Sequence, residues 1–136
     1  MAKMTIGLST ASLDKLTGLG VITSGAAADD MEVDIFVLLN AGPAFLKNNP
    51  AKDFLSEGDG DVEDFKSGLE KTGTPDWKEF LEMAKDMTEM KIYVCSLAGK
   101  VAGGENKEDF IDLVDEICGI GEYIESVQEA DVNLFL

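Results

Sequence analysis

The 136-residue chain has 27 acidic residues, 11 basic residues and no histidine, which gives a formal net charge of −16. Without histidine it cannot form a Ser-His or Cys-His catalytic pair or an imidazole metal site. This charge also argues against binding to nucleic acid or to an anionic membrane, because both depend on lysine and arginine. The length suits one domain, so we expect a single domain over residues 1–136.

The beginning of the chain, MAKMTIGL, enters an apolar run without the long apolar region of a signal peptide. No stretch is apolar for as long as a membrane-spanning helix requires. We therefore expect a cytoplasmic protein whose two cysteines, Cys95 and Cys118, are free thiols. Two cysteines are too few for a disulfide scaffold or a four-thiolate zinc site, and we expect neither a metal nor a cofactor.

Apolar runs predict strands at residues 4–8, 33–39, 91–95, 114–118 and 132–136. The fourth is ambiguous, because Phe110, Leu113, Val114 and Ile117 also have helical spacing; we favour a helix to about residue 112 followed by a strand. Strands that alternate with helices predict an α/β fold. We expect a five-stranded, mostly parallel, doubly wound sheet with helices on both faces.

Helical patterns fill the intervals between these strands. The segment after the first strand predicts a long helix, and a short helix is expected at residues 44–55. Thr74 as N-cap and Pro75 in the first turn predict a helix that ends near residue 89. Residues 96–102 are expected to form a loop that leads into a short helix, and residues 122–129 to form the last helix.

Two patterns suggest sites that we reject. Gly18-Leu19-Gly20 begins like a dinucleotide-binding loop, but Thr23 stands where the third glycine belongs, so helix packing explains these glycines better. Met83, Met87 and Met90 have helical spacing that could suit a soft metal, but methionine at such spacing usually fills gaps in a core. We expect all three methionines to be core residues.

Residues 56–74 are predicted to form an acidic surface loop. Asp59, Asp61, Glu63 and Glu70 have the spacing of calcium ligands, yet Asp64 occupies the position where such loops need a glycine. We therefore interpret the segment as solvated rather than metal-binding.

Cys95 is the candidate with chemical meaning, because the stretch KIYVCSLAGKVAGG passes from a buried strand directly to small residues. Ligands of open α/β sheets bind at the carboxyl ends of strands, where this thiol should lie. The backbone N–H groups of Ser96, Leu97 and Ala98 are expected to favour its thiolate over a free thiol of pKa ~8.5, and Lys100 adds positive charge.

Three further residues, at the ends of the first two strands, could line the same rim: Ser9, Thr10 and Asn40. The alternative is that Cys95 is only a small buried hydrophobic residue. The same alternative is stronger for Cys118, which precedes Gly119 and has no cation nearby in sequence.

The runs EFLEMAKDMTEMKIYVCSLAGKVAGGENKEDFID and GEYIESVQEADVNLF resemble the DsrE/DsrF-like family of small sulfur-relay proteins. SGAAADDMEVDIFVLL extends the resemblance over nearly the whole chain. The resemblance implies a five-stranded flavodoxin-like sheet and a homo-oligomer or mixed hexamer. It also implies that Cys95 carries sulfur as a persulfide or thiosulfonate. In place of the second cysteine of some members this chain has Gly103, and Ala98 and Ala102 replace the usual methionines.

These observations predict an intracellular sulfur-relay protein in which Cys95 takes sulfane sulfur from a donor and passes it to an acceptor thiol. The charge of −16 should slow the approach of small sulfur anions, so delivery by a partner protein is easier to justify. One alternative is a thiol redox protein that responds to peroxide through Cys95, although no resolving cysteine lies nearby in sequence. Another is a non-catalytic interaction or regulatory subunit of a sulfur-relay complex.

Overall fold

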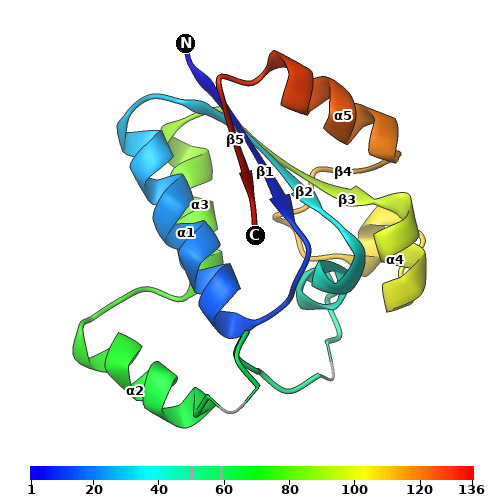
Figure 1. Cartoon of the computed structure of the whole chain (residues 1–136). Helices are drawn as coiled ribbons and strands as arrows, with labels where there is room; N and C mark the ends of the chain where they lie inside the picture. Colours follow the sequence, from blue (N-terminus) through cyan, green and yellow to red (C-terminus); the bar gives the residue numbers. More distant parts are fainter. Residues whose placement is uncertain (50, 59) are drawn as a thin grey trace.

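The computed structural model describes residues 1–49, 51–58 and 60–136. Helices and strands alternate through most of the chain (Figure 1). In chain order the elements are β1 Lys3–Leu8, α1 Leu13–Ala28, β2 Glu32–Val37, the 3₁₀ helix η1 Leu39–Phe45, α2 Val62–Lys71, α3 Trp77–Met87, β3 Met90–Cys95, α4 Ser96–Ala102, the 3₁₀ helix η2 Lys107–Asp109, β4 Glu116–Cys118, α5 Ile120–Glu129 and β5 Val132–Phe135.

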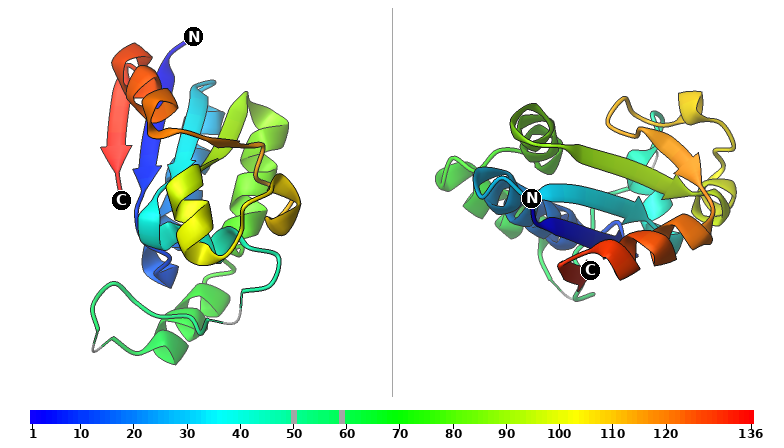
Figure 2. Two further views of the ribbon diagram at one scale, coloured as in Figure 1. Left: turned by 90° about the vertical axis from the view of Figure 1, so that its right-hand side faces the viewer. Right: turned by 90° about the horizontal axis from the view of Figure 1, so that it is seen from above.

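The strands of the described residues form one sheet in the order β4-β3-β2-β1-β5, and every neighbouring pair is parallel. Helices α1 and α3 pack together on one face, and α5 lies on the opposite face (Figures 1 and 2). The predicted five-stranded flavodoxin-like α/β fold with helices on both faces is therefore confirmed. Because parallel strands share one direction, all their carboxyl ends meet at one edge of the sheet.

The core lies on both faces of the central strands, which explains why those strands are almost continuously apolar. Among their fully buried side chains are Ile6, Val33, Ile35, Ile92 and Val94. The packing of α1 against α3 depends on a small residue, because a Cβ atom at Gly20 would lie 2.8 Å from the Cβ of Phe80. Gly20 is thus a helix-packing residue, as its sequence context indicated.

A buried polar cluster attaches α5 to the sheet. Asp34 on β2 forms an ion pair with Lys3 at 3.0 Å and accepts a hydrogen bond from the Ser126 hydroxyl at 2.9 Å. Ser126 is in turn 2.6 Å from the hydroxyl of Thr5 on β1. Because buried polar groups are costly when unpaired, this cluster specifies how α5 sits on the strands.

The prediction of an acidic loop over residues 56–74 is wrong in its centre, where α2 forms. The Asp61 side chain caps α2 by accepting hydrogen bonds from the backbone of Glu63 at 2.9 Å and Asp64 at 3.2 Å. Asp61 therefore satisfies amides of the first helical turn instead of facing a calcium ion. Asp59 of the rejected calcium pattern lies outside the described residues.

Three predicted boundaries are also corrected. The helix expected at 44–55 does not form: η1 ends at Phe45, and residues 46–49 and 51–55 are not helical. The backbone around Phe45 bonds across the chain instead, since Ile111 N donates to Phe45 O at 2.9 Å. The N-cap of α3 is Asp76 rather than Thr74, because the Asp76 side chain accepts from Lys78 N at 3.2 Å. Residues 96–102 are helical from Ser96 onward, without a leading loop.

The prediction that three methionines belong to the core holds for Met90 but is wrong for Met83 and Met87, which are 51% and 57% exposed. Helix α3 buries Trp77, Leu81 and Ala84, whose spacing defines a different face. No helix among the described residues is long and apolar enough to span a membrane.

Candidate functional site at the ends of β3 and β4

Cys95 is the last residue of β3 and the N-cap of α4, so it lies at the carboxyl edge of the sheet, where the chain turns from strand to helix. Its backbone is extended, with φ −63° and ψ 133°, and its side chain makes no capping hydrogen bond. Buried Ile92 and Val94 anchor the strand before it. The predicted position of Cys95 at this edge is therefore the observed one.

Helix α4 follows Cys95 without a connecting residue. The first amides of an α-helix have no intrahelical acceptor, and in α4 these include the N–H groups of Ser96, Leu97 and Ala98. Close packing fixes this short helix: a Cβ atom at Gly42 of η1 would lie 2.8 Å from the carbonyl oxygen of Ala98. Gly103 ends α4 in a left-handed conformation, with φ 98°.

Cys118 is the second thiol of the site. It is the last residue of β4, and its Cα atom is the register partner of that of Cys95. In-register residues of neighbouring parallel strands point to the same face of the sheet, so the two cysteines lie side by side. Both are buried, with Cys95 8% and Cys118 5% exposed. Sequence reasoning did not foresee this pair.

Burial is the main cause that raises the pKa of Cys118 to about 12, and electrostatic interactions with Glu122, Cys95 and Glu116 act in the same direction. Cys118 is consequently protonated at neutral pH.

Asp115 holds β4 in register with β3. Its side chain accepts hydrogen bonds from Ile92 N at 2.8 Å and from Lys85 Nζ at 2.6 Å, while its backbone N–H donates to Ile92 O at 2.8 Å. One residue thus joins the start of β4 to β3 and to α3. This anchor precedes Cys118 by three residues and so determines which residue of β3 faces that thiol.

The structure does not bring Ser9 and Thr10 beside Cys95. They follow β1, which β2 separates from β3, so they lie two strands away, or roughly 10 Å. Both the backbone N–H and the hydroxyl of Ser9 donate to Leu136 O, at 2.7 and 3.0 Å. Thr10 accepts a hydrogen bond from Ser12 N at 3.2 Å. These hydroxyls organise the ends of β1 and β5.

Asn40 and Lys100 are exposed. Asn40 belongs to η1, which packs against α4. Lys100 lies in the last turn of α4, five residues beyond Cys95 and hence about 7.5 Å along the helix axis.

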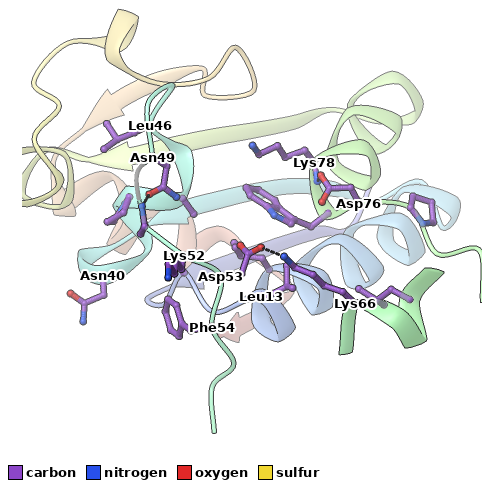
Figure 3. A pocket seen from close by; sticks show the side chains of 18 of the residues that line it. Leu13, Asn40, Leu46, Asn49, Lys52, Asp53, Phe54, Lys66, Asp76 and Lys78 are labelled. Atoms are coloured by element: carbon purple, nitrogen blue, oxygen red, sulfur yellow. Dashed lines mark hydrogen bonds and ion pairs between the residues drawn. The ribbon is translucent and has the colours of Figure 1, made fainter. Parts of the chain in front are cut away.

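A cavity of about 750 Å³ opens elsewhere on the molecule, and its lining includes Asn40 but not Cys95 (Figure 3). Its walls combine apolar side chains, including Leu13 and Phe54, with charged ones. Lys66 and Asp53 form an exposed ion pair there at 2.7 Å. Neither cysteine belongs to the lining of this cavity, which is therefore separate from the thiol pair.

The fold and the thiols define a small, single-domain α/β protein of flavodoxin-like type with a cysteine at the carboxyl edge of its sheet. The model of the DsrE/DsrF/DrsH-like family matches residues 55–135, which include both cysteines and more than half of the chain. The chain therefore belongs to this family, a family of sulfur-relay proteins. No curated protein matches the chain.

The pairing of Cys95 with Cys118 had a signal in the sequence. Each cysteine ends a predicted strand, and the two strands are consecutive in an alternating α/β chain. Consecutive strands of such folds are usually neighbours, with their ends at the same edge of the sheet. The two cysteines were not predicted to be neighbours, because 22 residues lie between them in the sequence.

Proposed function

We propose that this protein is a cytoplasmic sulfur carrier in which Cys95 accepts sulfane sulfur from a donor and passes it to an acceptor thiol. The observation that carries the proposal is the position of Cys95 at the junction of β3 and α4, on the carboxyl edge of a sheet that belongs to a sulfur-relay family. The carried form is a persulfide or a thiosulfonate.

The reaction is thiol exchange. The Cys95 thiolate attacks the outer sulfur of the donor and forms a new S–S bond on Sγ. The bond between that sulfur and the rest of the donor breaks, and the rest of the donor leaves as its anion. The amides of Ser96, Leu97 and Ala98 are proposed to bind the anionic adduct, and Lys100 to add positive charge nearby. No step is assigned to Ser9, Thr10 or Asn40: the first two follow β1, two strands from β3, and Asn40 is exposed on η1.

The burial of Cys95 is consistent with a sulfur carrier, which must protect its bound sulfur, more than with a protein that reacts freely with thiols in solution. A thiol that is 8% exposed meets bulk thiols slowly, which protects the carried sulfur from loss. A persulfide extends the reactive atom about 2 Å beyond Sγ, the length of an S–S bond, and so brings it closer to an acceptor. Exchange is therefore expected to be slow with small molecules and faster with a docked protein.

Exposed apolar side chains next to both cysteines support a protein partner. Leu97 and Val101 of α4 are 57% and 67% exposed, and Ile120 and Ile124 of α5 are 54% and 49% exposed. Each pair is four residues apart and shares one helix face. We propose that a less acidic sulfur donor or acceptor protein binds there, since the charge of −16 repels other acidic chains. Self-association, which the family resemblance implies, stays a prediction.

The test is intact mass spectrometry after incubation with thiosulfate, tetrathionate or polysulfide. Wild type is expected to gain sulfur that a reducing thiol removes, and Cys95→Ala to gain none at that site. Cys118→Ala is the matched control, because it removes the neighbouring thiol and leaves Cys95. Equal labelling of wild type and Cys95→Ala would show that Cys95 is not the carrier.

A further inference from the structure

The strand register makes Cys118 the nearest candidate to react with sulfur held on Cys95. The two residues are Cα partners at the last rung of the ladder between β3 and β4. Neighbouring strands lie about 4.8 Å apart, which is within the Cα separation of 4.4–6.8 Å, roughly, that a disulfide requires. Their side chains project to the same face, so closing a disulfide requires no reversal of either strand.

The surroundings also permit closure. β4 has three residues and lies at the edge of the sheet, where its only strand partner in the described sheet is β3. A small change in its spacing therefore disturbs one short ladder and none of the others. Immediately after Cys118, Gly119 is exposed, and a Cβ atom there would meet nothing within 4 Å. The residue after Cys118 therefore adds no side-chain packing that would oppose a small movement of the strand end.

We propose that Cys118 is the resolving residue of the site: it attacks Sγ of a persulfide on Cys95, releases hydrosulfide and leaves a Cys95–Cys118 disulfide. This inference rests on the proposed loading of Cys95. It gives the sulfur carried on Cys95 a second fate: the sulfur leaves as hydrosulfide instead of passing to an acceptor as sulfane sulfur.

The step balances as Cys95–S–S⁻ plus HS–Cys118 giving Cys95–S–S–Cys118 plus HS⁻. The bond between the two protein sulfurs forms and the bond from Cys95 Sγ to the terminal sulfur breaks. The terminal sulfur takes the electron pair and is reduced, the Cys118 sulfur is oxidised, and the thiol proton ends on hydrosulfide. A reducing dithiol then returns both cysteines to thiols by two exchange steps.

The protonated state of Cys118 makes this release a slow alternative to transfer. Because burial raises its pKa to about 12, its thiolate fraction increases about tenfold for each pH unit through the neutral and mildly alkaline range. Sulfur on Cys95 is therefore retained near neutral pH, which leaves time for an acceptor to bind. Release accelerates with pH, or when the environment of Cys118 becomes more polar.

The test has two arms, and one does not require sulfur loading. In the first arm, the chain is loaded with polysulfide and the excess donor is removed. The release of hydrosulfide and the formation of the disulfide are then followed with time. Separately, Cys95 is converted to its mixed disulfide with 5,5′-dithiobis(2-nitrobenzoate), and loss of the bound nitrothiobenzoate is followed. Wild type is compared with Cys118→Ser and Cys118→Ala in both arms. Two substitutions are used because a hydroxyl at a buried position can destabilise the fold where alanine does not.

We expect wild type to release hydrosulfide in one arm and nitrothiobenzoate in the other. The product should be lighter than the unloaded, reduced chain by the mass of two hydrogens and should yield a peptide that joins both cysteines. Both variants should keep their adducts at least tenfold longer, and wild-type release should rise with pH. Equal adduct lifetimes in wild type and variants would overturn the inference while leaving the carrier function intact. Disulfide formation from the mixed disulfide without any loading by sulfur donors would support the resolving step and contradict the carrier function. A Cys95 that reacts with neither reagent would overturn both.

Discussion

Substitution of Asp115 by alanine tests whether this one residue holds β4 against β3. The change removes the acceptor of two hydrogen bonds, from Ile92 N at 2.8 Å and from Lys85 Nζ at 2.6 Å, and leaves the backbone bond to Ile92 O in place. A matched control exists three residues earlier, because Asp112→Ala removes the same charge from an exposed side chain.

The expected cost follows from the burial of each partner. The Lys85–Asp115 pair is 22% and 26% exposed in its side chains, so screening reduces its contribution to about 1 kcal/mol or less. Loss of the acceptor for the Ile92 amide costs about 1 kcal/mol or more, because a carboxylate accepts this bond. Together these give about 2 kcal/mol, or a fall of roughly 6–8 °C in the melting temperature of a domain of this size.

Thermal unfolding followed by circular dichroism measures this effect. Asp115→Ala should melt clearly below wild type, while Asp112→Ala should stay close to it. A slower closure of the Cys95–Cys118 disulfide in folded Asp115→Ala would show that the register has loosened as well. If both variants melt within about 1 °C of each other, Asp115 does not anchor β4 and the reasoning is wrong.

Two further predictions concern stability. Gly18→Ala should stabilise the chain by about 0.5–1 kcal/mol, because a Cβ there meets nothing within 4 Å, whereas Gly20→Ala should destabilise it by about 1–3 kcal/mol through contact with Phe80 at 2.8 Å. Urea unfolding of both variants measures the difference, and the same sign for both would contradict the packing of α1 on α3. Stability should also fall as pH rises from about 9 toward 12, because the unfolded chain loses the Cys118 proton near 9.0 while the folded chain keeps it to about 12. Cys118→Ala should show a smaller fall over this range, and an equal fall in both proteins would mean that Cys118 is not held protonated by the fold.

Much of the fold was predictable because the central strands are buried on both faces. Such strands leave continuous apolar runs, and the runs at 4–8 and 33–39 correspond to β1 and β2 within one or two residues. The run at 91–95 placed Cys95 at a strand end for the same reason. The position of the principal candidate residue was therefore available from local sequence.

Helix boundaries were less predictable, because several residues competed to cap the same helix. Thr74 and Asp76 both suit an N-cap, and only the observed bond from Lys78 N to the Asp76 side chain decides between them. Helix α2 was not predicted, because its acidic residues suggested a solvated loop. In the structure Asp61 caps the helix and half-buried Phe65 packs against the core. Tertiary contacts determined both outcomes.

The members of the site could not be chosen from sequence without the order of the strands. Ser9 and Thr10 end β1, which lies beyond β2 from Cys95, whereas Cys118 ends β4, which lies directly beside it. All four residues occupy strand ends, so only the sheet order separates the distant pair from the near neighbour. Cys118 therefore faces Cys95, although its neighbours in the sequence gave little reason to expect a functional thiol.

The central claim is that Cys95 carries sulfur, and the adduct mass of the polysulfide-treated chain tests it most directly. After alkylation and proteolysis, the peptide containing Cys95 is predicted to hold one additional sulfur in wild type and in Cys118→Ala. Reduction before alkylation should remove that sulfur. Because exchange of the buried thiol with small molecules is expected to be slow, the incubation is continued until labelling no longer increases. A Cys95 peptide that is still unmodified in the folded protein at that point would contradict the account.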